Sequence, residues 1–115
     1  MWFFGEVRRM AASMYTIEMD FSRAQEQAGK LDAIAARMVE LAESDMADCL
    51  TDLLANWKGE SAALYGRKGR EMERQVKSTA EELRKTAQAL RTMAASVYRA
   101  EKQAVQAAKT RTYGE

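Results

Sequence analysis

The side chains that could do chemistry in this chain of 115 residues are few, and their pattern favours no catalytic site. Histidine is absent and Cys49 is the single cysteine, so the usual general base, a His/Cys metal site and an intrachain disulfide are all missing. Without an imidazole partner, Cys49 is expected to be a small buried hydrophobic residue. Carboxylate catalysis stays open on composition alone, but no cleft is implied. We therefore expect no enzyme, no catalytic residue, no cofactor and no bound metal.

Two charged stretches are the next candidates. The first carries five carboxylates and no basic residue over residues 40–52: Glu40, Glu43, Asp45, Asp48 and Asp52. The second is mainly basic over residues 67–77: Arg67, Lys68, Arg70, Arg74 and Lys77. A divalent-cation site at Asp45, Asp48 and Asp52 is one interpretation, but a helical face lacks the closed oxygen cage of a calcium loop. If the chain folds back at its midpoint, positions whose numbers sum to about 117 pair, which favours ion pairs between the stretches.

The overall charge and hydropathy argue against two other classes. A formal net charge of +1 gives no reason to expect a nucleic-acid binder, and the acidic stretch would cancel much of the field of the basic one. The chain has no apolar run of roughly eighteen residues, and no helix has a heavily basic face. We therefore expect neither a nucleic-acid partner nor stable membrane insertion.

The first residues do not match a secretory signal. The apolar residues 2–4 are followed by Gly5 and Glu6, whereas a signal peptide needs roughly seven to fifteen apolar residues. We expect no cleavable signal. Met10 and Met14 are possible alternative starts, and a start at Met14 would place residues 1–13 outside the native protein. Apolar and polar residues alternate from Tyr15 to Asp20, which predicts a short extended arm that completes an N-terminal extension over residues 1–19.

The remaining pattern predicts two long helices, because helix-forming residues dominate and proline is absent. The first is expected over residues 22–57, with Asp20 or Ser22 as its N-cap. Gly29 lies within it, either because another helix approaches closely or as a tolerated defect. The second is expected over residues 61–109. Its large apolar residues recur at heptad-like spacing, flanked by Ala80, Ala87 and Ala94, and form the expected bundle seam. The seam residues are Met72, Val76, Leu83, Leu90, Met93 and Val97.

The stretch Trp57-Lys58-Gly59 separates the two helices. Gly59 can adopt the positive φ that reverses a chain after a helix, and Trp57 can cover the end of the core. The sequence thus predicts an all-α fold in which residues 20–109 form an antiparallel two-helix hairpin with a turn over residues 57–61. Residues 110–115 are expected to be a flexible tail. Because one hairpin cannot cover its apolar surface, we expect it to dimerise into a four-helix bundle.

A hairpin of about this size with Trp57-x-Gly59 at its centre resembles the WXG family, the early-secretory-antigen-like proteins of type VII secretion systems. The resemblance covers residues 17–109 and includes Ala62, Ala63 and Leu64 after the motif. It implies a non-enzymatic, virulence-associated protein that acts through protein–protein interaction. It also implies a homodimer or a heterodimer with a related hairpin protein, exported folded without a cleaved leader and recognised by the type VII secretion ATPase.

The resemblance further implies an export signal in which the Trp-x-Gly turn of one subunit joins a Tyr-x-x-x-Asp/Glu motif of its partner. Here Tyr98 is followed by Glu101 at the third position and by Lys102 at the fourth, which departs from the motif. Both Tyr98 and Glu101 are expected on one accessible helix face. Tyr98 could equally be an ordinary surface aromatic residue. A cytoplasmic helical adaptor or chaperone that pairs with a secreted partner is the alternative function.

Overall fold

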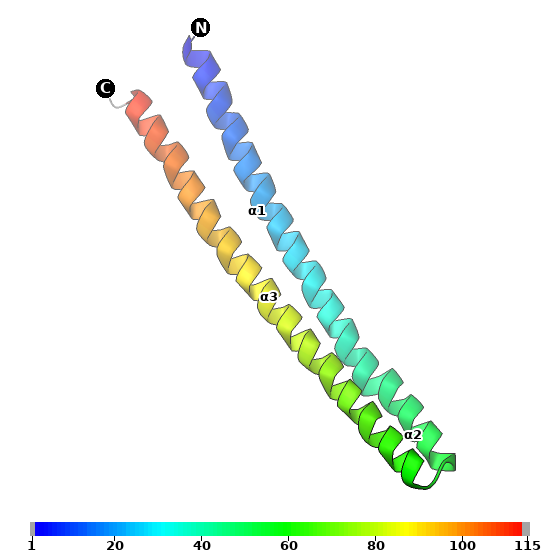
Figure 1. Cartoon of the computed structure of the whole chain (residues 1–115). Helices are drawn as coiled ribbons and strands as arrows, with labels where there is room; N and C mark the ends of the chain where they lie inside the picture. Colours follow the sequence, from blue (N-terminus) through cyan, green and yellow to red (C-terminus); the bar gives the residue numbers. More distant parts are fainter. Residues whose placement is uncertain (1, 114–115) are drawn as a thin grey trace. The chain divides into compact units, whose positions relative to one another are not determined.

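The computed structural model describes residues 2–113, and every one of them is helical except residues 57–59. In chain order the elements are α1 (Trp2–Glu40), the π-helical stretch η1 (Leu41–Met46), α2 (Ala47–Asn56) and α3 (Glu60–Tyr113). No strand occurs among the described residues, so the all-α class is confirmed. Figure 1 shows α2 beside the beginning of α3, joined by the short connection. Uninterrupted helices of this length follow from a sequence without proline.

The short extended arm predicted from the alternation between Tyr15 and Asp20 is wrong, because these residues belong to α1. Ile17 is only 7% exposed, and Met14, Phe21 and Ala24 are half-buried. These residues follow one another at intervals of three and four, which places them on one face of a helix. A strand would have divided them between two faces. The longer helical periodicity therefore outweighs the short alternation.

Two predicted boundaries are also wrong, the beginning of the first helix and the end of the second. Asp20 and Ser22 are exposed residues within α1 and cap nothing. Residues 110–113 extend α3, whereas residues 114–115 of the predicted flexible tail lie outside the described residues. No proline or glycine stands between the predicted end of the second helix and residue 113, so nothing in the sequence stops the helix earlier.

The chain divides into two compact units, which are described separately. Unit 1 consists of residues 1–28 and 88–115, and unit 2 consists of residues 29–87. Unit 1 is formed by the first part of α1 and the second part of α3. Its most buried residues are Ile17 and Ala28.

In unit 2 the most buried side chains are small. Alanine residues that are at most 3% exposed occur on both helical segments: Ala35, Ala42, Ala62, Ala80 and Ala87. A Cβ atom built on Gly66 would lie 3.0 Å from Leu54 Cδ1, and one on Gly69 would lie 2.9 Å from Leu50 Cδ1. Small side chains let two helices approach closely. Ala80 and Ala87, two of the alanines expected beside the seam, are therefore among the most buried residues of α3. The larger apolar residues lie beside them.

The π-helical stretch explains an error in the prediction for Cys49. Ala35 and Ala42 are buried seven residues apart, so a regular helix would bring Cys49 to the same line. A π-helical turn accommodates one extra residue. Leu50, which is 8% exposed, consequently takes the buried position, and Cys49 is exposed. The predicted burial of Cys49 is wrong because the helix changes its phase within η1.

Deleting one residue from η1 should therefore be tolerated, because a regular α-helix would then keep Leu50 on the buried line. We expect deletion of Ser44 to leave the thermal midpoint unchanged or higher. Deletion of Ser78, an equally exposed serine in the regular helix α3, should rotate neighbouring turns by about 100°. It should cost about 2–4 kcal/mol, as core disruptions do. Thermal unfolding by circular dichroism compares the two, and equal losses would contradict this role of η1.

Candidate functional site

The connection between α2 and α3 has a defined backbone. Trp57 is extended, with φ −119° and ψ 118°, and Gly59 has φ +111°, so the predicted positive φ is confirmed. The N–H of Ala63 donates to the carbonyl oxygen of Gly59 at 3.0 Å, which closes the first turn of α3. Glu60 places a carboxylate in that first turn, where the helix dipole favours it. The Gly59 position is open, since a Cβ atom there would meet nothing within 4 Å.

Trp57 is a partly exposed aromatic residue. Its ring lies 5.4 Å from that of Tyr65, centroid to centroid, with the planes tilted by 55°. Trp57 is 37% exposed and Tyr65 is 52% exposed. Trp57 thus packs on an aromatic neighbour at the end of unit 2 and also presents a ring edge to solvent. Sequence reasoning did not find Tyr65 as the partner, although its position in the first turns of α3 could have indicated it.

A groove of about 370 Å³ runs beside this connection. Its lining includes the small and apolar residues Leu54, Ala62 and Gly66, together with Trp57. The basic residues lining it are Lys58, Arg67 and Arg70, and no carboxylate lines it. Sequence reasoning recognised the arginines but not the groove, because the groove depends on the close approach of α2 to α3.

Only one ion pair joins the acidic and basic stretches among the described residues. Lys77 Nζ lies 2.9 Å from Glu43 Oε1, and both side chains are about half exposed. The predicted interhelical pairing is confirmed for this pair and wrong for the others. Asp48 and Asp52 each lie two residues from the buried Leu50, which turns them about 200° away from it and from α3.

The three aspartates considered as a cation site are all exposed: Asp45, Asp48 and Asp52. Among residues 2–113, no three acidic, cysteine or histidine side chains are grouped so that they could hold a metal ion. The three aspartates therefore form a row of carboxylates that faces solvent.

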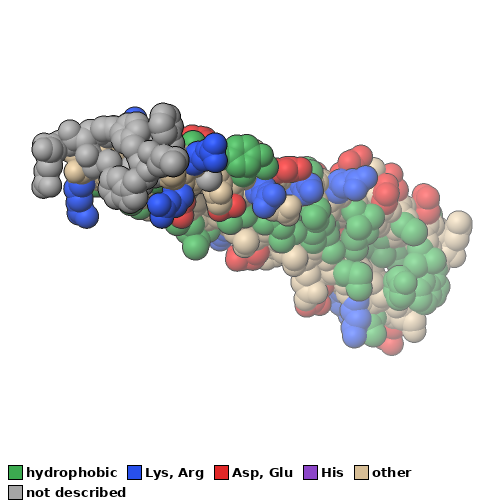
Figure 2. All heavy atoms as spheres, turned by 90° about the horizontal axis from the view of Figure 1, so that it is seen from above, with side chains coloured by type: hydrophobic (Ala, Val, Ile, Leu, Met, Phe, Trp, Pro, Cys, Tyr) green, Lys and Arg blue, Asp and Glu red, His purple; other side chains and the backbone are tan. Residues whose placement is uncertain are grey.

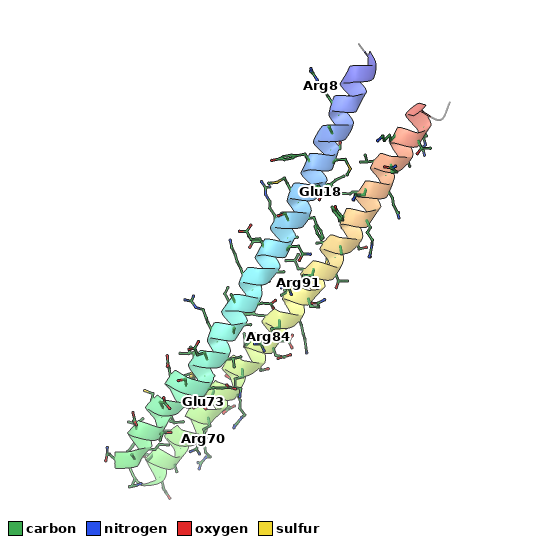
Figure 3. All side chains as sticks on the ribbon, turned by 180° about the vertical axis from the view of Figure 1, so that it is seen from behind. Arg8, Glu18, Arg70, Glu73, Arg84 and Arg91 are labelled. Carbon is green, nitrogen blue, oxygen red and sulfur yellow. The ribbon has the colours of Figure 1, made fainter. Side chains whose placement is uncertain are left out.

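Tyr98 of the candidate export signal is not freely accessible. Its ring stacks on Phe21 with 4.4 Å between centroids, and its hydroxyl donates to Glu18 Oε1 at 2.7 Å. Figure 3 labels Glu18 on α1. Lys102 adds to the contact, with Nζ 5.0 Å from the centre of the Tyr98 ring. Tyr98 was expected on an accessible face, and in the structure it is half-buried and joins α1 to α3 within unit 1.

Glu101 remains exposed and lines the rim of a groove of about 270 Å³ in unit 1. Asp20 lies on the same rim, and Ile17, Leu90 and Val97 line the apolar part. The turn motif belongs to unit 2, whereas Tyr98 and Glu101 belong to unit 1.

The predicted seam residues occupy one flank of α3. Each of them lies one residue before or three residues after a row spaced by seven: Gly66, Glu73, Ala80, Ala87 and Ala94. On an α-helix these two offsets are rotations of about 100° and 60° in the same direction away from that row, so all the seam residues lie on one side of it. Met72, Met93 and Val97 are 58%, 65% and 53% exposed. Val76, Leu83 and Leu90 are half-buried. Hydrophobic side chains are exposed among charged ones on the surface seen in Figure 2.

Within residues 2–113, no helical segment combines the length and hydropathy needed to cross a bilayer. Comparison of the chain with protein-family models, curated proteins and solved structures finds no match.

The same substitution should act in opposite directions at two glycines. Gly59→Ala should destabilise the protein by about 1–3 kcal/mol, because a φ of +111° strains any residue with a Cβ atom. Gly29→Ala should stabilise it by about 0.5–1 kcal/mol, because Gly29 is exposed within α1 and an added Cβ atom meets nothing within 4 Å. Urea unfolding measures both. A neutral Gly59→Ala would show that the connection can relax.

Proposed function

We propose that this chain is a small non-enzymatic substrate or partner protein of a type VII secretion system. In this proposal it forms an antiparallel hairpin around a Trp-x-Gly turn, dimerises into a four-helix bundle and is exported in folded form without a cleaved signal peptide. It acts through protein–protein interaction, with a second copy or a related hairpin protein and with the secretion ATPase. The proposal rests on the residues that resemble the WXG family.

The observation that carries the proposal is the state of Trp57. Large aromatic residues that are partly exposed at a rigid position are typical of recognition surfaces. The Trp57 ring packs on Tyr65 and lies two residues before Gly59, whose φ is +111°, yet Trp57 keeps 37% of its surface exposed. A purely structural tryptophan at a helix end would be expected to bury its ring.

An unpartnered apolar flank in unit 2 supports dimerisation. A groove of about 190 Å³ is lined by Cys49 and Leu53 from α2 and by Tyr65 from α3, so these residues face the same side. Ile34 and Leu41, which are 47% and 45% exposed, each precede a buried alanine by one residue, as Cys49 precedes Leu50. They therefore continue the same flank along α1 and η1. Exposed apolar surface of this extent is typical of an interaction site.

The dimer can be tested with two matched substitutions on α3. Met72→Glu places a charge on the proposed interface and should weaken dimerisation at least about tenfold. Gln88→Glu is the control, because Gln88 is exposed and follows the buried Ala87 by one residue, whereas the flank residues Tyr65 and Met72 precede the same row by one residue. Sedimentation velocity over a concentration series gives the dissociation constants. A wild-type protein that stays monomeric, or equal effects of the two changes, would contradict the interface.

Export provides the functional test, in cells that contain a type VII secretion system. Trp57→Ala and Glu101→Ala should each lower the amount of protein in the medium about tenfold or more, with the cellular amount unchanged. Tyr98→Phe tests the hydroxyl while keeping the stacking on Phe21. Glu82→Ala is the control, because Glu82 is an exposed glutamate elsewhere on α3. Normal secretion of the Trp57 and Glu101 variants would contradict the proposed signal.

A cytoplasmic adaptor or chaperone is the second candidate, and one observation favours it. Tyr98 is engaged by Phe21, Glu18 and Lys102, which limits its presentation to a secretion ATPase. In that case the wild-type chain should be absent from the medium while it binds a secreted hairpin protein in the cell. Co-purification from cells, followed by mass determination of the complex, distinguishes this function from export.

A further inference from the structure

We propose that the basic groove beside the connection, lined by Lys58, Arg67 and Arg70, docks the acidic row of a second copy of this chain, Asp45, Asp48 and Asp52. This contact is separate from the proposed dimer flank. Gly66 packs against α2. Arg67 of the basic groove follows Gly66 in the sequence, whereas Tyr65 of the dimer flank precedes it. The groove and the flank therefore lie on opposite sides of the face of α3 that contacts α2. The contact would add a charge-dependent association to the proposed dimer and does not depend on export.

The cations of the groove lack partners of their own. Among the described residues, none of Lys58, Arg67, Arg70 and Arg74 forms an ion pair, and all four are exposed. Figure 3 labels Arg70 near the beginning of α3. On the α2 side of the groove the neighbouring residue is the uncharged Leu54. Glu71 lines the adjoining surface together with Arg67, Lys68, Arg70 and Arg74, and within the described part of the chain it forms no ion pair with them.

The spacing of the two rows matches. Arg67, Arg70 and Arg74 are separated by three and four residues, and Asp45, Asp48 and Asp52 are separated by three and four residues. Residues three and four apart share one face of an α-helix, which places Arg67, Arg70 and Arg74 together over about 10 Å of α3. Asp48 and Asp52 likewise share one face of α2, and Asp45 precedes them within η1. Arginine pairs well with carboxylates because its planar guanidinium can donate two parallel hydrogen bonds.

The two rows cannot satisfy each other within one copy. Asp48 and Asp52 point away from α3, since each lies two residues from the buried Leu50. The exposed side chains of Lys58, Arg67 and Arg70, and not the buried Ala62 and Gly66, are what the groove offers to a second copy. A second copy therefore supplies the carboxylates that the groove lacks, and its own groove remains open for another copy. Such a heterologous contact can extend beyond a dimer.

Charge reversal and mixing test this contact. The groove variant is Arg67→Glu/Arg70→Glu, and the acidic variant is Asp48→Lys/Asp52→Lys. The control Arg84→Glu/Lys85→Glu makes the same change in net charge as the groove variant, elsewhere on α3. Light scattering at high micromolar concentration compares the average mass at about 25 mM and about 500 mM salt, where screening differs strongly. Wild type and control should associate about tenfold or more tightly at the lower salt concentration.

At the lower salt concentration each variant alone should remain at the mass that the wild type has at high salt. An equimolar mixture should regain mass, because the native aspartates of the groove variant meet the native arginines of the acidic variant. Circular dichroism checks that all variants stay helical. The Met72→Glu variant should retain the salt-dependent step, which separates this contact from the dimer. A salt-independent wild-type mass, or a mixture no heavier than its components, would overturn the proposal.

Discussion

The structure depends on the close approach of helical segments through small side chains. In unit 2, Gly66 and Gly69 accept Leu54 and Leu50 at distances that leave no room for a Cβ atom without adjustment. Buried alanines extend this contact, as Ala35, Ala42, Ala80 and Ala87 show. When the contact line uses small residues, larger apolar side chains are displaced to its flanks and stay partly exposed. The internal packing thus creates the surface available for a partner.

The π-helical stretch η1 keeps this contact line continuous. It absorbs one residue between Ala42 and Leu50, so a leucine rather than a cysteine reaches Gly69. The same change of phase turns Asp48 and Asp52 toward solvent and Cys49 toward the apolar flank. One local departure from regular helix geometry therefore decides which groups are available to a partner, since every following side chain rotates with the backbone.

Trp57 and Tyr98, the two candidate recognition residues, differ in how many contacts they make within the chain. Trp57 has one aromatic neighbour and an exposed edge, whereas Tyr98 combines ring stacking, a hydrogen bond to Glu18 and a contact with Lys102. Lys102 occupies the position at which the resemblance leads one to expect an acid, and here it stabilises the tyrosine. Of the two aromatic residues, Trp57 therefore has fewer contacts within the chain than Tyr98.

The sequence by itself determined the helical class, the interruption at Trp57-Lys58-Gly59 and the positive φ of Gly59. Helix propensity and glycine chemistry are local properties, so they can be read from neighbouring residues. The tertiary structure decided the burial of Ala80 rather than Met72, the exposure of Cys49 and the pairing of Glu43 with Lys77 while Asp48 and Asp52 face solvent. These outcomes depend on the phase of one helix against another. An extra residue within η1 shifts that phase, and no local pattern in the sequence marks where such a residue is absorbed.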